Sequence, residues 1–354
     1  MTLRFTKGRC PRTGQWLVPL RDEWGFTDKR PLSPSLERKL CATAAETGSY
    51  EKAATLAAEW GASLSGNAVR SCVLHLGLRA AENPLDAPCQ ERAGPGDTLV
   101  IMADGWMARH RGKGWGFSFK ESVEGWNAVE WREIKSAVIY RLRDQTSTGS
   151  KRGALLHKHV VATPAGTGPV VFGRRVHHEA LRMGLAQAQR VYLVMDGALW
   201  LWNLFEERFA AVAVGTLDFY HASQHIHELA AVLFGEEAKE WAGDLLGGLR
   251  RRGPSQLYAT LADLAAAPPD ERPETQEAIR KAAGYFEGHE DHLDYPGAEA
   301  EGWPIGSGSI ESQCSQFQNR FKRRGQFWSE LGFAALMEVV CRHQNGELQS
   351  LWAA

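Results

Sequence analysis

Three acidic residues stand where the chain could hold divalent metal ions. Asp104 and Asp196 each end a strongly apolar run and are each followed by glycine, and Glu311 lies in the segment Pro304–Cys314. Mg²⁺ prefers hard oxygen ligands, and two such ions about 3.5 to 4 Å apart can stabilise the attacking and leaving oxygens of a phosphodiester transfer. The pattern therefore predicts that these three carboxylates are catalytic and bind two Mg²⁺ ions, with Mn²⁺ as a substitute.

Each of the three residues also has a simpler explanation. An Asp-Gly pair is common in turns, and Glu311 could stabilise a helix start beside Ser307 or Ser309 as the cap. Both aspartates, however, follow runs that resemble buried strands, which hold a side chain rigidly at the edge of a sheet. A carboxylate there is costly unless it is paired or bound to a metal.

The composition is that of an ordinary globular protein. The chain has 354 residues, of which 44% are hydrophobic and 23% charged, enough to bury a sizeable core. No run approaches the roughly 18 apolar residues of a membrane span, and Met1–Arg12 lacks a signal sequence. We therefore expect a cytoplasmic protein without a membrane partner.

Cysteine and histidine spacing gives no sign of a zinc site. The six cysteines form no C-x-x-C pair, so we expect reduced thiols and neither a zinc ribbon nor a disulfide framework. His157, His159, His177 and His178 have no cysteine pair nearby and no i, i+4 His-Glu pattern. We expect no metal at these histidines.

The elements that must position the three carboxylates are expected to form an α/β fold in which a mixed sheet has helices on its faces. We divide the chain into an irregular N-terminal segment, a small helical module, a linker, the first part of the core, a helical insertion and a C-terminal helical region with a basic cluster. Their bounds are 1–32, 33–80, 81–97, 98–220, 221–300 and 301–354.

Within the core, apolar runs predict buried strands at Thr98–Ala103 and Val191–Met195. Further strands are expected around Trp115–Phe119, Ile134–Leu142, His157–Ala162, Val170–Phe172 and Ala211–Leu217, with helices at His178–Gln189 and Leu199–Phe209. Trp106, Trp126, Trp131, Trp200 and Trp202 are interpreted as packing residues.

The helical module has the order of a helix-turn-helix. Ser33-Pro34 opens one helix, Tyr50–Trp60 forms a second, and Ser65 or Asn67 caps a third that runs to about Leu76. In such motifs the helix after the turn enters the major groove of DNA, which would expose Asn67, Arg70 and His75. A helical cap with no DNA contact is the alternative.

Charge alone argues weakly against a nucleic-acid partner, because the net charge is −1. The cluster Arg320–Arg324 is nevertheless strongly basic. We predict DNA contacts from Arg320, Lys322, Arg323 and Arg324, with Trp328 stacking on an unpaired base. A solvated basic helix face with its aromatic residues in the core is the alternative.

Five motifs together permit a family to be named. They are Ile101–Trp106, Val194–Trp200, Leu217–Ser223, Pro304–Ser312 and Gln318–Trp328. In this order they resemble the DDE transposases of bacterial insertion sequences, in particular the Kra-type family of the Mutator-like group. The resemblance spans roughly residues 98 to 352.

This resemblance implies a fold and a set of site residues. The fold would be an RNase H-like core with Asp104 on the first strand, Asp196 on the fourth, and Glu311 on a helix after the helical insertion. These three residues match the metal-binding triad of the family. Asp218-Phe-Tyr-His221 matches its C/D-x-x-H motif, so Asp218 and His221 are expected beside the metal site; a helix cap with a buried partner is the alternative.

The resemblance also implies an activity. Cleavage at the element end would free a 3′-hydroxyl, which would then attack target DNA at the same site. The partners would be double-stranded DNA, both terminal inverted repeats and target, with the chain a homodimer or larger near the bacterial nucleoid. Two alternatives stay open: a transposase-derived DNA-binding regulator or inhibitor without strand transfer, and an RNase H-like nuclease that cleaves without joining.

Overall fold

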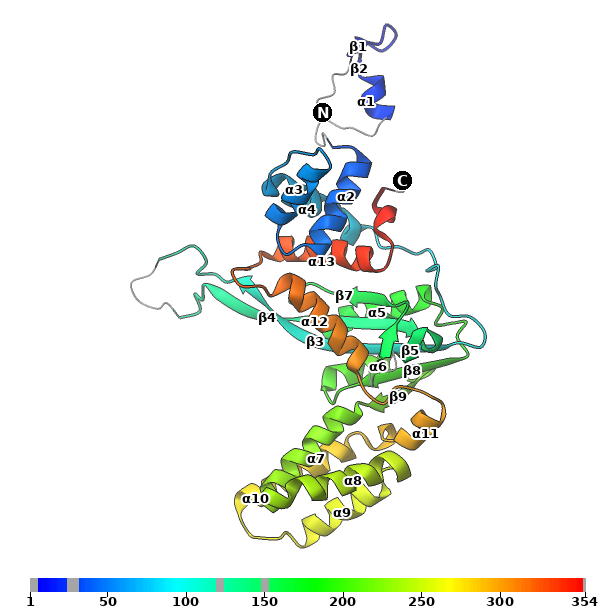
Figure 1. Ribbon diagram of the computed structural model, residues 1–354, viewed down its shortest axis with the longest axis vertical. Coiled ribbons are helices and arrows are strands. Elements are labelled where there is room, and N and C mark those ends of the chain that lie inside the picture. The colour runs from blue at the N-terminus through cyan, green and yellow to red at the C-terminus, as the bar shows by residue number, and fades with distance from the viewer. Residues whose placement is uncertain (1–5, 24–31, 119–123, 148–152, 353–354) are drawn as a thin grey trace.

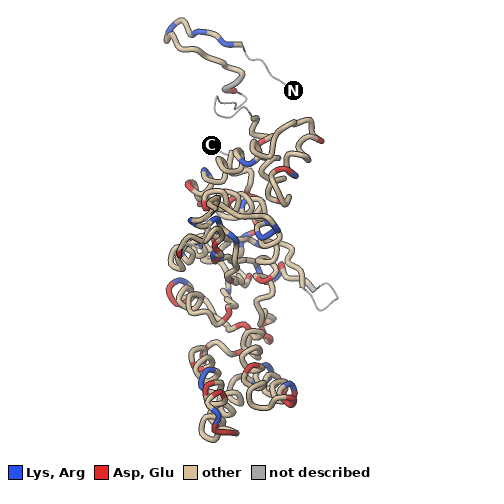
Figure 2. Tube along the Cα trace, turned by 90° about the vertical axis from the view of Figure 1, so that its left-hand side faces the viewer, with Lys and Arg blue, Asp and Glu red and all other residues tan. Residues whose placement is uncertain are grey.

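The computed structural model describes residues 6–23, 32–118, 124–147 and 153–352. The molecule is elongated, with N-terminal helices toward one end, a sheet at the centre and a second group of helices at the other end (Figure 1). Basic and acidic residues are interspersed along this length (Figure 2). Within the described part of the chain, no helix is both long and apolar enough to cross a membrane.

The central sheet is mixed and has five strands in the order β7-β4-β3-β8-β9. β4 runs antiparallel to both β3 and β7, whereas β8 and β9 run parallel to β3. The strands are β3 (Thr98–Arg111), β4 (Val129–Arg141), β7 (His159–Ala162), β8 (Arg190–Met195) and β9 (Val214–Leu217). The predicted mixed α/β sheet is confirmed.

Alternation along β3 divides the hydrophobic core into two layers. Val100, Met102 and Trp106 face α12 (Gly308–Phe321) and α13 (Glu330–Gln344). Leu99 and Ile101 point to the opposite face, where α5 (Pro169–Arg182) and α6 (Leu199–Arg208) cover the sheet. Because successive side chains in a strand point to opposite faces, one apolar run supplies both layers.

Three N-terminal helices share the first of these layers. A serine caps each one, and its hydroxyl accepts a backbone N–H in the first turn. The helices are α2 (Pro34–Glu46), α3 (Tyr50–Glu59) and α4 (Gly66–Glu82). They join the same apolar cluster as α12 and α13. The helical module at 33–80 is therefore packed into the core of the chain rather than standing apart on its linker.

The segment between β9 and α12 forms the second group of helices, at the lower end in Figure 1. The helices are interrupted at Gly253-Pro254 and at Pro268-Pro269. These helices are α7 (Phe219–Phe234), α8 (Ala238–Arg252), α9 (Ser255–Ala266), α10 (Pro273–Glu287) and α11 (Tyr295–Ala300). Their inward side chains extend the apolar layer that lies under α5 and α6.

Several local predictions were wrong. The strand expected at Thr98–Ala103 does not end before Asp104 but continues to Arg111, and the helix expected at His178–Gln189 is the end of α5, which stops at Arg182. Residues 1–32 are not wholly irregular, because β1 (Gly8–Arg9) and β2 (Trp16–Leu17) pair as a hairpin before α1 (Pro19–Glu23). Trp115–Phe119, of which residue 119 lies outside the described residues, is a turn after β3 rather than a strand.

Val170–Phe172 belongs to helix α5, because proline at the first helical position, Pro169, favours the start of a helix. Two short strands that were not expected, β5 (Gln145–Ser147) and β6 (Gly153–Leu155), form a hairpin before β7.

A close contact between two helices of the first layer predicts a strong effect of one added methyl group. A Cβ on Gly77 of α4 would lie 2.1 Å from the carbonyl oxygen of Ala335 on α13. We expect Gly77→Ala to lower the free energy of unfolding by about 1–3 kcal/mol, since the helices must move apart. Urea unfolding of the variant and the wild type measures this difference in the free energy of unfolding.

Gly243→Ala is the matched control. Gly243 is also helical, and an added Cβ there meets nothing within 4 Å. This variant should be neutral or more stable by about 0.4–1 kcal/mol. Equal effects of the two substitutions would contradict the close packing of α4 on α13.

Candidate active site

Asp104 and Asp196 are brought level by the pairing of two parallel strands. Met102 of β3 pairs with Val194 of β8. Asp104 and Asp196 each follow two residues after this pair, so they lie side by side. Parallel neighbours lie about 4.8 Å apart, and residues separated by two positions share a face. Both carboxylates therefore lie at the same end of the strand pair, on the face that α12 covers.

The local backbone fixes both aspartates. Asp104 Oδ1 accepts a hydrogen bond from the N–H of Gly105 at 2.6 Å, and Asp196 Oδ1 accepts one from the N–H of Ala198 at 2.8 Å. The carbonyl of Asp196 also accepts the indole N–H of Trp202 at 2.9 Å. Both aspartates are half-buried.

Glu311 reaches this face from the first turn of α12. Ile310, Cys314 and Phe317 lie one helical turn apart and pack into the layer above β3 and β4. Glu311 follows Ile310 and is exposed, and Ser307 Oγ donates to Glu311 Oε1 at 3.0 Å. Packing of the apolar helix face thus holds Glu311 at the end of α12 that lies near the aspartates.

The charges of the three carboxylates act on one another. The pKa of Asp104 is raised, mainly by burial, and also by the negative charges of Asp196 and Glu311, while the Gly105 N–H and His221 lower it. The pKa of His221 is raised, first by Asp218 and then also by Asp196 and Glu311. The site therefore concentrates negative charge around one histidine.

Asp218 ties the segment before α12 to the sheet. It is fully buried and caps α7, accepting the N–H of Tyr220 at 2.6 Å. Its other oxygen accepts the N–H of Ser307 at 2.9 Å and lies 3.4 Å from His221 Nδ1. Burial alone would raise the pKa of Asp218, but its contacts with His221, Ser307 and Tyr220 together lower it. Asp218 is thus a helix cap that also positions the loop leading to Glu311.

Two residues near the carboxylates carry no motif that sequence reasoning could use. A Cβ on Gly197 would lie 2.4 Å from the ring of Tyr285, so α10 brings this tyrosine directly over the turn after Asp196. The pKa of Tyr285 is raised by burial and by the charges of Asp196 and Asp218. Cys314, one turn beyond Glu311, contacts Asp104, and burial raises the pKa of its thiol.

The predicted DNA-contacting residues divide into exposed and buried ones. Asn67 and Arg70 are exposed on α4, and Arg323 and Arg324 are exposed after α12, while Lys322 is half-buried. All five lie outside the hydrophobic core, where a phosphate could approach them.

Arg320 and Trp328 require correction, because they are only 6% and 8% exposed. Arg320 Nε donates to the carbonyl of Ala44 on α2 at 2.9 Å, and burial lowers the pKa of its guanidinium to about 10. Trp328 Nε1 donates to the carbonyl of Phe321 at 2.7 Å. Both residues therefore hold α2, α12 and the following loop together, and neither is placed to touch DNA.

An exposed aromatic surface lies at the far end of β3 and β4 instead. Trp131 is 53% exposed, with the guanidinium of Arg109 5.8 Å and the ammonium of Lys322 5.1 Å from its ring centroid. Arg111 lies 5.1 Å from the ring of the exposed Trp115. Trp126 is exposed as well, so the prediction that Trp126 and Trp131 are packing residues was wrong.

The carboxylate set fits hard divalent cations. Asp104, Asp196 and Glu311 offer only oxygen ligands, and their mutual repulsion is what a cation would relieve. Among the described residues, their oxygens do not form a cluster of three within 4.8 Å.

Known proteins give this geometry little further support. No family model and no curated protein matches the chain. Among solved structures, the chain is similar to the Drosophila P element transposase strand transfer complex, with a TM-score of 0.40 and 10% sequence identity over 93% of this chain and 98% of that chain. A likeness at this TM-score does not establish a shared fold.

The double role of Asp218 predicts a pH-dependent loss of stability in Asp218→Asn. The amide has one acceptor oxygen, so it would turn a donor toward the N–H of either Tyr220 or Ser307, and we expect a loss of about 1–3 kcal/mol at pH 7. Because the pKa of Asp218 is lowered in the folded state, the stabilisation by its carboxylate is present above its ordinary pKa of about 3.9. That stabilisation disappears as the pH falls through the folded pKa.

Urea unfolding of both proteins between pH 7 and pH 3 tests this, and the difference between them should shrink at low pH. Asp294→Asn is the control, since Asp294 caps α11 through the N–H of Gly297 at 2.9 Å but is exposed. Asp294→Asn should lower the free energy of unfolding by less than Asp218→Asn does. A pH-independent difference would contradict the role given to the Asp218 charge.

Proposed function

We propose that the chain is a metal-dependent DNA transposase of an insertion sequence, with an RNase H-like core and a triad of Asp104, Asp196 and Glu311. One observation carries the proposal: the parallel register that aligns the two aspartates on the face where α12 presents Glu311. β3 is the first strand of the central sheet in chain order and β8 the fourth. Those are the positions that the resemblance to Kra-type transposases implies.

The three carboxylates would hold two Mg²⁺ ions, which when bound stabilise charge on the phosphate and activate the attacking oxygen. The chain itself supplies rigidity, because strand pairing fixes Asp104 and Asp196, and the Asp218–Ser307 hydrogen bond fixes the loop before Glu311. A fixed site lowers the cost of orienting the reacting groups. The same carboxylates would serve both cleavage of the element end and joining to target DNA.

DNA would approach along the exposed aromatic surface and the basic loop after α12. Arg323 and Arg324 are placed to neutralise backbone phosphates, and Trp131 offers a stacking face flanked by Arg109 and Lys322. Asn67 and Arg70 on α4 are exposed for contact with the element end. Because joining two ends requires both in one complex, we propose a homodimer or larger assembly on DNA.

Removing one carboxylate tests the catalytic proposal. Asp196→Asn keeps an oxygen that can accept the N–H of Ala198 but removes the charge. Since loss of a group that merely supports a metal ligand costs about 10- to 100-fold, we expect a larger loss of cleavage and joining. The measurement uses Mg²⁺ and a labelled duplex carrying the end of the element.

Asp263→Asn, an exposed change on α9, is the matched control and should retain full activity. Cleavage without joining by the wild type would favour the nuclease alternative. Binding without cleavage by either protein would contradict the catalytic proposal and favour a transposase-derived regulator.

The aromatic surface gives a separate prediction about DNA binding. Trp131→Ala should weaken binding of an oligonucleotide with unpaired bases at its end by about 1–3 kcal/mol, because stacking on the ring is lost. Fluorescence anisotropy measures this affinity. Trp131→Phe keeps a ring and should lose less; equal affinities of wild type and Trp131→Ala would show that DNA does not contact this surface.

A further inference from the structure

A second group of metal-ligand side chains lies away from the carboxylates, where three separate segments meet. Cys89 lies between α4 and β3, His159 begins β7, and Glu347 follows α13. Cys89 Sγ is 3.7 Å from both His159 Nδ1 and Glu347 Oε1. In the described part of the chain, no other set of three His, Cys, Asp or Glu ligand atoms lies within 4.8 Å of one another.

We propose that Cys89, His159 and Glu347 form a site for a divalent transition metal of the Zn²⁺ class. For His159 this departs from the expectation drawn from sequence spacing, because its two partners are distant in sequence. The spacing fits such an ion. Zn–S bonds of about 2.3 Å and Zn–N or Zn–O bonds of about 2.0–2.1 Å, at tetrahedral angles, separate sulfur from each other ligand by about 3.6 Å. The two observed separations from Cys89 Sγ are 3.7 Å.

Arg182 supplies one hydrogen bond to Glu347 Oε1, and the remaining contacts within the cluster are those of the Cys89 thiol with the imidazole and the carboxylate. His159 Nε2 lies 2.9 Å from Glu179 Oε2. When the Nε2 hydrogen is donated to Glu179, Nδ1 is left as an acceptor directed at Cys89. A thiol has one hydrogen, so Cys89 can donate it to either His159 Nδ1 or Glu347 Oε1 but not to both. A cation satisfies all three ligand atoms at once.

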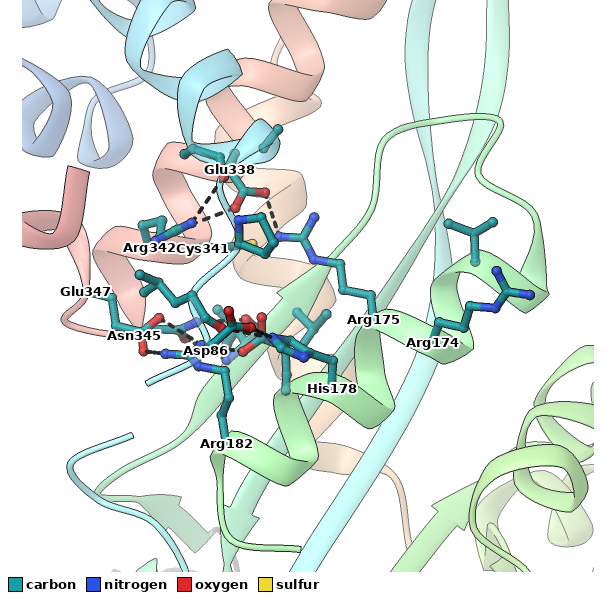
Figure 3. Close-up of a pocket in the computed structure, with 18 residues that line it drawn as sticks. Asp86, Arg174, Arg175, His178, Arg182, Glu338, Cys341, Arg342, Asn345 and Glu347 are labelled. Atoms are coloured by element: carbon teal, nitrogen blue, oxygen red, sulfur yellow. Dashed lines mark hydrogen bonds and ion pairs between the residues drawn. The ribbon is translucent and has the colours of Figure 1, made fainter. Parts of the chain in front are cut away.

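The surrounding residues support the ligands as those around a metal site do. A carboxylate that accepts from the second nitrogen of a histidine is the usual support of a metal-binding imidazole, and Glu179 has this position. Arg182 bridges Glu179 and Glu347 through ion pairs, and Figure 3 shows it directed toward Glu347. A divalent ion and Arg182 would balance the thiolate, Glu347 and Glu179.

A cavity gives solvent access to the cluster. It has a volume of about 420 Å³ and is lined by all three proposed ligands, together with His157 and Lys158. A water molecule from this cavity can complete a four-coordinate site. The buried Cys89 and His159 and the half-buried Glu347 are therefore within reach of an incoming ion.

The ligand chemistry separates this site from the carboxylate triad. Thiolate and imidazole ligands favour Zn²⁺ or Co²⁺, whereas Mg²⁺ and Mn²⁺ favour oxygen. A metal held here would fasten the segment after α4 to β7 and to the end of α13, at the junction between the N-terminal helices and the sheet. The inference is independent of the function proposed above.

Titration of the metal-free full-length chain with Co²⁺ tests the site, because a thiolate ligand produces a sulfur-to-cobalt charge-transfer absorption that oxygen ligands do not. We expect this band to saturate at one Co²⁺ per chain and to disappear on addition of Zn²⁺. It should be absent from Cys89→Ser and retained in Cys72→Ser, since both cysteines are 8% exposed. Asp196→Asn should also retain it.

Two further variants guard against loss of folding in Cys89→Ser. Glu347→Gln should weaken Co²⁺ binding by tenfold or more, and Glu179→Gln should weaken it by about 10- to 100-fold, with circular dichroism unchanged. Zn²⁺ should raise the Tm of the wild type but not that of Cys89→Ser. Absence of the thiolate band from the wild type, or its persistence in Cys89→Ser, would overturn the proposal.

Discussion

The parallel pairing of β3 with β8 is the constraint on which the candidate site depends. It sets Asp104 level with Asp196, and the alternation of side chains directs both toward α12. A slip of one residue in either strand would turn one aspartate into the opposite apolar layer. The buried runs before each aspartate therefore serve two purposes: they stabilise the sheet and they fix the two carboxylates.

Bringing three carboxylates together works against folding, and the surrounding structure compensates. The raised pKa of Asp104 reflects burial and repulsion from Asp196 and Glu311. Asp218 offsets this by accepting hydrogen bonds from two segments, the start of α7 and the loop before α12. The helices between β9 and α12 thus have a direct structural link to the position of Glu311, and α10 adds Tyr285 over the turn after Asp196.

Local sequence patterns predicted what depends on local physics. The apolar start of β3, the end of β8 before Asp196 and the serine caps at Ser33 and Ser65 follow from hydrophobic runs and capping preferences. The continuation of β3 past Asp104 to Arg111 did not follow from the apolar run, because pairing with β4 extends the strand. The positions of Arg320 and Trp328 did not follow, because a basic run does not reveal which of its members the helix turns inward. Nor did the meeting of Cys89 with His159 and Glu347, which are 70 and 258 residues away in sequence. Only tertiary packing brings such residues together.

The central claim is that Asp104, Asp196 and Glu311 form one binding site for two metal ions. Anomalous X-ray diffraction from crystals of the chain with Mn²⁺ and a duplex of the element end tests it directly. The account predicts two anomalous peaks about 3.5–4 Å apart between these carboxylates, absent in Asp196→Asn. No peak at the triad, or peaks that do not involve Asp196, would contradict it.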